Sequence, residues 1–428
     1  MSRTTFGDGT AAAFVIPVLL LAGGAASVEA GGQSGSARYT FTTILDSQRD
    51  GLEATRCAAI NGLGVVAVTV RDTTAGDTKI ITRRGAADAP VIVADTQSVA
   101  DSPIFCDNGF TSLPSDPSIN ELGEVAFQGN LRRLTTRPDC NTPEQRERRQ
   151  GVFAGRGGTL TTIAHTINTP GGSFIAEFLV ADQSLNSFGR AAIVPELDDT
   201  FEQGLYIGSR TGTFEQRFLA DVPTPDGFTF GNLSSRVSLN ELGQVAFESH
   251  RTDTSASGIF LSNPNGTFRT IVDNATTFDS IGDPSLNIFG RVAFTASRFD
   301  EDFNQIFSVN TSRGGPVTQV AESSAGGYAS FREPSLNDLG RVAFTADVQP
   351  DPDVFTTVQG VFTGPDPVAD KVLQVGDIYD GVPITSIVTC SEALNNRGQI
   401  AMTVQSEDPI TFDVRTFIVR ATPRPHHD

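Results

Sequence analysis

A pattern of apolar, polar and glycine positions recurs seven times along this chain. In each copy a Ser-Leu-Asn-like triplet is followed by two variable residues, a Gly, one variable residue and an apolar run such as Val-Ala-Phe. An Asn three residues before a Gly is typical of a type I turn, because the Asn side chain bonds the turn backbone and Gly tolerates the left-handed conformation. The pattern therefore predicts a strand, a tight turn and a second strand around Asn61, Asn120, Asn186, Asn240, Asn287, Asn337 and Asn395.

The apolar run after each turn indicates how the second strand packs. Side chains alternate between the two faces of a strand, so Val and Phe point to one face and Ala to the other. A strand that is buried on both faces, and crowded on one of them, has this composition. We therefore expect each repeat to pack between two neighbours.

Two further strand-like segments follow the motif in most repeats. One is short and apolar, as in Gly258–Phe260, and the other is rich in Thr, Val and Ile, as in Leu160–Ile163. The second kind follows only six motifs, and its seventh copy stands before the first motif, at Tyr39–Ile44. This N-terminal strand can complete the repeat that contains Asn395, which closes a ring and removes exposed sheet edges. The sequence predicts an all-β fold: a seven-bladed β-propeller of four-stranded antiparallel blades, rather than an open solenoid.

The segment 334–344, Pro-Ser-Leu-Asn-Asp-Leu-Gly-Arg-Val-Ala-Phe, resembles the repeat of TolB-type and WD40-like propellers. It resembles more closely the repeats of uncharacterised secreted bacterial proteins with the pattern Ile-Asn-x-x-Gly-x-Val-Ala-Phe. The resemblance covers nearly all of the chain after its N-terminal region. It implies a propeller fold and no particular activity.

The N-terminal region reads as an export signal. Residues 11–22 form an apolar stretch that is too short to span a bilayer, and small residues with candidate cleavage sites after Ala26 and Ala30 follow it. We predict a signal peptide over residues 1–30, a linker over 31–38, the propeller over 39–421 and a disordered tail over 422–428. The mature protein is then secreted, periplasmic or at the cell surface, with no stable membrane anchor after cleavage.

The charge distribution points to one face of the ring as the ligand-binding face. A net charge of -19 argues against nucleic acid as a partner. By analogy with other propellers we name the strands of a blade A to D from the axis outward, so the B–C loops and D–A crossovers share one face and the Asn-x-x-Gly turns lie on the other. Most B–C loops are acidic, and the candidate ligand-binding residues are Asp198, Asp199, Asp300, Glu301, Asp302, Asp347, Asp351 and Asp353. The alternative is a solvated, solubilising surface.

No cofactor motif is present, but carboxylate clusters of this kind suit Ca²⁺. The candidate calcium ligands are Asp300, Asp302, Asp351 and Asp353. The B–C loop of the second blade (130–150) differs, because it carries six arginines: Arg132, Arg133, Arg137, Arg146, Arg148 and Arg149. This loop either pairs with its own acidic residues or docks on an acidic face.

Four cysteines in an exported chain suggest two disulfides. Cys106 and Cys140 belong to connections on one face of the second blade, so we pair them. Cys57 and Cys390 belong to the first and last blades, which are neighbours in a closed ring, and a disulfide between them would reinforce the junction.

The sequence lacks the recognised catalytic and phosphate-binding motifs that we looked for. We therefore favour a non-enzymatic extracellular propeller, expected to be a monomer, that binds a protein, a glycan or a cation through its B–C face. The alternative is an extracellular polysaccharide hydrolase or lyase on a propeller scaffold, because carboxylate pairs for such chemistry could lie among so many acidic residues.

Overall fold

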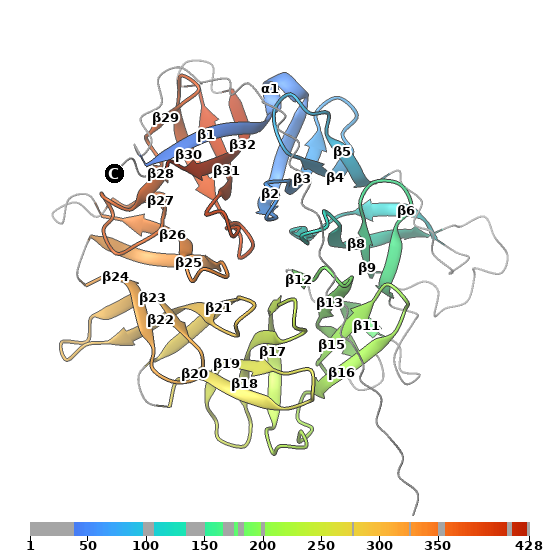
Figure 1. Ribbon diagram of the computed structural model, residues 1–428, viewed down its shortest axis with the longest axis vertical. Coiled ribbons are helices and arrows are strands. Elements are labelled where there is room, and N and C mark those ends of the chain that lie inside the picture. Colours follow the sequence, from blue (N-terminus) through green and yellow to red (C-terminus); the bar gives the residue numbers. More distant parts are fainter. Residues whose placement is uncertain are drawn as a thin grey trace, which may run out of the picture.

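Seven antiparallel sheets stand around a common axis and follow one another in chain order (Figure 1). The computed structural model describes residues 38–96, 107–133, 150–165, 175–178, 184–197, 202–275, 278–324, 327–349, 356–408 and 413–425. Each sheet has four principal strands, with strand A nearest the axis and strand D at the rim. The predicted seven-bladed propeller is confirmed.

The first four blades contain the strands β2 to β20. Blade 1 consists of β2 (Leu52–Ile60), β3 (Val66–Asp72), β4 (Thr78–Arg83) and β5 (Val91–Asp95). Blade 2 consists of β6 (Asp107–Ser112) and β7 (Ser118–Ile119), which both pair with β8 (Val125–Arg133), then β9 (Gln150–Gly155) and β10 (Thr161–His165). Blade 3 consists of β12 (Ser184–Leu185), β13 (Arg190–Ile193), β15 (Gly204–Ser209) and β16 (Phe214–Leu219), beside a small ribbon of β11 (Ile175–Phe178) and β14 (Pro195–Leu197). Blade 4 consists of β17 (Phe230–Leu239), β18 (Val245–Arg251), β19 (Ser257–Ser262) and β20 (Phe268–Asp273).

The last three blades contain the remaining strands and β1. Blade 5 consists of β21 (Ser280–Leu286), β22 (Val292–Phe299), β23 (Gln305–Ser312) and β24 (Thr318–Glu322). Blade 6 consists of β25 (Tyr328–Leu336), β26 (Val342–Val348), β27 (Val358–Phe362) and β28 (Lys371–Gln374). Blade 7 consists of β30 (Val382–Val388), β31 (Ile400–Glu407), β32 (Val414–Pro423) and β1 (Tyr39–Asp46), with β29 (Ile378–Tyr379) paired to β30. A short helix, α1 (Ser47–Asp50), leads from β1 to β2. Within the described residues, no helix is long and apolar enough to cross a membrane.

The apolar run of strand B explains how neighbouring blades pack. The Ala of one blade lies in the same buried cluster as the Val and Phe of the next, so Ala246 packs with Val292 and Phe294. The same arrangement recurs at all seven blade interfaces and includes the last one, where Ala401 of blade 7 meets Val66 and Val68 of blade 1. A small residue on one face and large residues on the other therefore set the close approach of adjacent sheets.

The motif asparagines form a closed ring of hydrogen bonds about the axis. In each turn the Gly N–H donates to the Asn carbonyl, and the Gly has a φ between 71° and 79°. The Asn Oδ1 accepts backbone N–H groups within its own turn, and its Nδ2 donates to the carbonyl of the motif Asn in the next blade. The seven Nδ2–O distances lie between 2.8 and 3.4 Å, and the seventh joins Asn395 to Asn61.

The two ends of the chain close the ring, as the position of the N-terminal strand predicted. β1 pairs antiparallel with β32, from Tyr39 opposite Pro423 to Asp46 opposite Phe417, so the strand continues beyond residue 421. Asp46 caps α1 and accepts two hydrogen bonds from the Arg415 guanidinium, at 2.9 and 2.6 Å. Cys57 and Cys390 form the expected disulfide between blades 1 and 7, with Cα atoms 5.7 Å apart. Cys106 and Cys140 lie outside the described residues.

The asparagine ring predicts the effect of Asn240→Asp on stability. The carboxylate keeps the acceptor for Leu242 N and Gln244 N but loses the donor to the Asn287 carbonyl, which is buried. We expect the free energy of unfolding at neutral pH to fall by about 1–3 kcal/mol, measured by urea denaturation. The matched variant Asn232→Asp changes an exposed residue and should shift the free energy of unfolding by less than about 0.5 kcal/mol. Equal effects of the two variants would contradict a structural role for the ring.

The closure predicts a pH-dependent contribution from Asp46. Burial opposes ionisation of this carboxyl, but the hydrogen bonds and charge of Arg415 outweigh it and hold the pKa below its usual value of 3.8. A lowered pKa in the folded state adds stability above the unfolded pKa, and this stability is lost as the pH falls through the folded pKa. We expect Asp46→Asn to cost about 2 kcal/mol at neutral pH, and the difference from the unmodified protein to shrink as the pH falls below 4. Asp302→Asn, on an exposed loop, serves as the control in the same thermal melts, and a cost that does not depend on pH would contradict the assignment.

Candidate functional site at the central channel

The residue four positions before each motif asparagine belongs to the strand A region, in the second half of β2, β17 and β25 and at the middle of β21. Because strand A runs from the D–A crossover to the Asn-x-x-Gly turn, this position lies between the turn and the end of the channel that the B–C loops and D–A crossovers surround. In the six blades where this position lies within the described residues, it is occupied by Cys57, Asp116, Arg236, Asp283, Glu333 and Ser391. Four of these residues are charged, although a repeat scaffold has no need of charge at this position.

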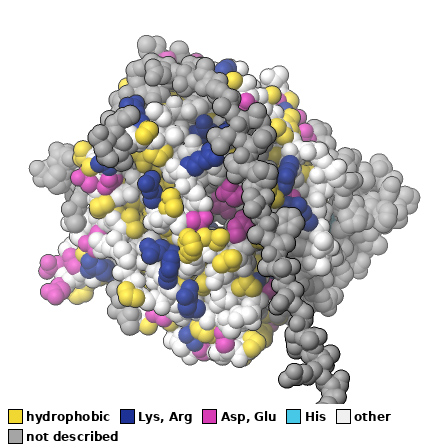
Figure 2. Space-filling view, viewed as in Figure 1, with side chains coloured by type: hydrophobic (Ala, Val, Ile, Leu, Met, Phe, Trp, Pro, Cys, Tyr) yellow, Lys and Arg dark blue, Asp and Glu magenta, His cyan; other side chains and the backbone are white. Residues whose placement is uncertain are grey.

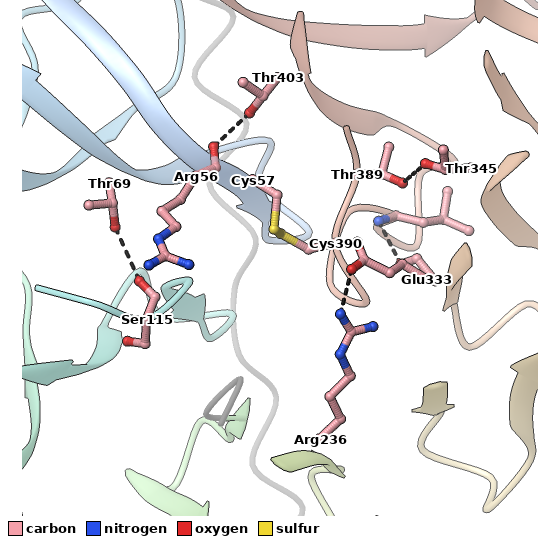
Figure 3. Close-up of a disulfide and its surroundings, with 12 residues drawn as sticks. Arg56, Cys57, Thr69, Ser115, Arg236, Glu333, Thr345, Thr389, Cys390 and Thr403 are labelled. Carbon is pink, nitrogen blue, oxygen red and sulfur yellow. Dashed lines mark hydrogen bonds and ion pairs between the residues drawn. A yellow bond between two sulfur atoms is a disulfide. The ribbon is translucent and has the colours of Figure 1, made fainter. Parts of the chain in front are cut away.

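An arginine joins three blades at this end of the channel. Arg236 of blade 4 forms ion pairs with Asp283 of blade 5 at 2.7 Å and with Glu333 of blade 6 at 2.5 Å (Figure 3). Asp283 and Glu333 each precede a Pro and have φ values of 55° and 48°. Residues other than Gly rarely adopt this left-handed backbone, and such strain concentrates at functional sites.

A cavity of about 250 Å³ opens beside these ion pairs. Its lining comes from blades 1, 2, 6 and 7 and includes both charges and hydroxyls: Ala54, Thr55, Arg56, Cys57, Asp116, Glu333, Ser386, Val388, Thr403 and Gln405. The Cys57–Cys390 disulfide stands in its wall, and Thr403 Oγ1 donates to the Arg56 carbonyl beside it (Figure 3). The disulfide and this hydrogen bond fix the wall between blades 7 and 1.

A segment of blade 7 crosses the channel and contacts blades on other sides of the axis. Glu392 Oε1 accepts hydrogen bonds from Ser118 Oγ of blade 2 and Ser184 Oγ of blade 3, each at 3.0 Å. The carbonyl of the preceding residue, Ser391, accepts from Ser285 Oγ of blade 5. Contacts with blades on several sides of the axis show that residues 391 and 392 span it.

The opposite end of the channel, on the face with the Asn-x-x-Gly turns, has an acidic centre. Figure 2 shows this face, with Asp and Glu side chains gathered near the axis and Lys and Arg side chains spread around them. Glu121, Glu241 and Asp338 follow motif asparagines, and each carboxylate accepts a hydrogen bond from a backbone N–H of the preceding blade. Partial desolvation raises the pKa of Glu121, and the negative charges of Glu241 and Asp338 raise it further.

The predicted acidic residues of the B–C loops divide into two groups. Asp198, Asp199, Asp351 and Asp353 lie outside the described residues. Asp300 accepts from Asp302 N and from both nitrogens of Asn304 within its own loop, and these bonds, led by the Asn304 side chain, lower its pKa. Asp347 accepts from Ser330 Oγ at 2.7 Å and from Arg332 Nη2 at 2.6 Å within its own blade. Glu301 and Asp302 are exposed.

The described part of the chain contains one grouping with the spacing of a metal site: Cys57, Asp116 and Cys390. Both sulfur atoms belong to the disulfide, so this grouping is not a thiolate site. The candidate calcium residues Asp300 and Asp302 share one hairpin, and their proposed companions lie in the part of the chain that is not described.

The channel residues were missed in the sequence, although a signal for them was present. Asp116, Asp283 and Glu333 all occur as an acidic residue followed by Pro-Ser and the motif. An acidic residue before Pro at an equivalent place in three repeats indicates a shared position in the strand A region. The partner Arg236 has no such signal, because blade 4 has Val where the others have Pro.

Comparison with known proteins identifies the family. The chain belongs to a protein family of unknown function, DUF7453, whose model matches residues 60–416. No curated protein matches the chain.

Among solved structures, the chain is similar to the β-propeller domain of the Trilobed protease from Pyrococcus furiosus. That match has 8% identity and a TM-score of 0.47, and covers 88% of this chain and 94% of the other. The polysaccharide lyase Uly1 is similar at 9% identity, with a TM-score of 0.45 and coverage of 87% and 89%. An oligogalacturonate lyase in complex with manganese matches at 9% identity, with a TM-score of 0.41 and coverage of 84% and 97%. At such low identities the likeness concerns the fold alone.

Proposed function

We propose that the protein is an exported, non-enzymatic binding module whose ligand enters the channel from the B–C face. The observation that carries this proposal is the cavity beside Arg236, Asp283 and Glu333, which is lined by charged residues from several blades. Ligand sites are concave and combine a few convergent polar groups with a rigid frame. The asparagine ring and the disulfide supply that frame.

The chemistry of the cavity favours a polar, hydroxyl-bearing or charged ligand such as the end of a glycan or peptide chain. Arg56 offers an exposed cation, Asp116 and Glu333 offer carboxylates, and Thr403 and Ser386 offer hydroxyls. The acidic B–C loops, with Asp300, Glu301 and Asp302 among their described residues, and Asp347 near the end of β26 stand on the same face and would contact the more distant parts of a large protein or glycan. Export fits the disulfide between blades 1 and 7, because disulfides persist in oxidising compartments.

Binding at the cavity predicts that Arg56→Glu weakens the interaction. The variant places a third carboxylate beside Asp116 and Glu333. It keeps the backbone carbonyl of residue 56, which accepts the hydrogen bond from Thr403. We expect a glycan array and a peptide array to yield a binder of the purified protein, and this variant to lose affinity by about tenfold or more.

The matched control for this experiment is Arg71→Glu, because Arg71 is exposed at the B–C end of β3 and lies outside the cavity lining. Equal losses for the two variants would contradict binding at the cavity. Release of product from an array polysaccharide, abolished by Glu333→Gln, would overturn the non-enzymatic assignment in favour of a hydrolase or lyase.

The acidic B–C loops also generate a calcium prediction. If Asp300, Asp302, Asp351 and Asp353 hold Ca²⁺, the ion binds only the folded state, and Ca²⁺ raises the melting temperature by several degrees at concentrations well above its dissociation constant. Chelator should reverse the shift, and Asp300→Asn combined with Asp353→Asn should abolish it. A melting temperature that neither Ca²⁺ nor chelator moves would count against the calcium site and leave the cavity proposal intact.

A further inference from the structure

The face with the Asn-x-x-Gly turns carries an unexplained ring of exposed apolar side chains. In six of the seven turns the residue two positions after the Asn is Leu or Phe, and these side chains are between 52% and 75% exposed. They are Leu63, Leu122, Phe188, Leu242, Phe289 and Leu339, and Arg397 occupies the seventh position. We call them the apolar tips.

The turn geometry explains why these side chains point outward. The backbone N–H of a tip donates to the Oδ1 of its motif Asn, as Leu242 N does to Asn240 at 3.1 Å. The main chain therefore faces the asparagine ring, and the side chain faces solvent. A turn does not need a large apolar residue at this place, and turn positions ordinarily favour Gly, Asn, Asp and Ser. The apolar tips therefore have a purpose other than folding.

The apolar tips stand at one level. All seven turns have the same length and the same hydrogen bond from Gly N to Asn O, and the asparagine ring ties them side by side. Six projecting side chains at one height around a disc match a flat surface. They protrude as separate side chains and do not form a groove. A protein partner would need a complementary pocket for each of them, whereas a lipid headgroup layer is deformable and needs no complementary shape.

Arginines surround the apolar tips. Each blade contributes at least one exposed arginine on this face, mostly from its C–D turn, which lies farther from the axis than the A–B turn. They include Arg84, Arg156, Arg210, Arg269, Arg313, Arg341 and Arg397. The chain as a whole carries -19, so these arginines give this face a charge character unlike that of the whole molecule. Figure 2 shows Lys and Arg side chains distributed around apolar patches on this face. Guanidinium groups are suited to phosphate oxygens.

The acidic centre is compatible with an anionic partner, because its carboxylates form hydrogen bonds with neighbouring blades. Glu241 accepts from Ser187 N at 2.9 Å and Asp338 accepts from Ile288 N at 2.9 Å, each in the neighbouring blade. These bonds turn the carboxylates along the ring rather than outward. A second copy is disfavoured as the occupant, because two sets of exposed arginines would then face each other.

We propose that the apolar tips and the arginines around them form a docking surface for a lipid bilayer that carries anionic phosphate headgroups. The apolar side chains enter the headgroup layer, and the arginines bind phosphate at its surface. The protein then lies on the membrane as a disc, with the channel cavity on the opposite, solvent-facing side. This proposal concerns a different face from the binding cavity, and either can fail without the other.

The chain contains no Trp, so a single introduced Trp reports on one site. Leu242→Trp places the fluorophore at an apolar tip, and we expect its emission to shift to shorter wavelength with vesicles of phosphatidylcholine and phosphatidylglycerol. Phe303→Trp is the matched control, because Phe303 is 87% exposed in the B–C loop of blade 5 on the other face, and its emission should not move. No shift at position 242, or equal shifts at both positions, would overturn the proposal.

Vesicle sedimentation tests the two components separately. Phe188→Ser combined with Phe289→Ser should lower the partition coefficient by about tenfold or more. Arg156→Glu combined with Arg313→Glu should do the same and remove the dependence on phosphatidylglycerol and salt. Phe303→Ser and Arg71→Glu, on the other face, should leave binding unchanged, and so should Arg56→Glu. Absence of vesicle binding, or tip-dependent self-association in its place, would reject a lipid surface as the occupant.

Discussion

The side-chain amide of each motif asparagine donates to the main-chain carbonyl of the asparagine in the next blade, and the seventh donates to the first. Each amide also holds its own turn through Oδ1, so one side chain fixes both the shape of a turn and its place beside the next one. The bond is buried, where an unmatched donor or acceptor is costly. Seven sheets can therefore meet at an axis without continuous sheet hydrogen bonding between them.

The alternation of strand B adds the second constraint. The Ala of one blade meets the Val and Phe of the next, and the same pairing is reached at the junction between blades 7 and 1. Large and small faces that interlock in one rotational sense fix the spacing between blades. The asparagine ring joins the blades at the axis, and the strand B contacts set the spacing between them. Neither constraint involves the outer loops, which are therefore free to vary in sequence.

The sequence predicted the ring and its closure because those features repeat. The offset of Tyr39–Ile44 relative to the last motif indicated the β1–β32 pairing, and the membership of Cys57 and Cys390 in adjacent blades indicated the disulfide. The channel could not be predicted in the same way. Arg236 meets Asp283 and Glu333 across separations of 47 and 97 residues, and no repeat rule states which charges turn inward at the axis. Glu392 crosses the channel in the last repeat, which departs from Ser-Leu-Asn, and a departure from a pattern does not show where the chain goes.

The closure of the ring also sets the order of events in folding. β1 is synthesised long before its partner β32, so the strand pair that completes blade 7 has the other six blades between its members. At ~5–20 residues per second, synthesis of the intervening chain takes roughly 20–75 s. Blades 1 to 6 can form in sequence during this time, while β1 keeps an unpaired edge and blade 1 lacks a neighbour on one side. The last step is therefore the one with the greatest sequence separation and the slowest search, and the disulfide between the first and last blades holds the closed ring together.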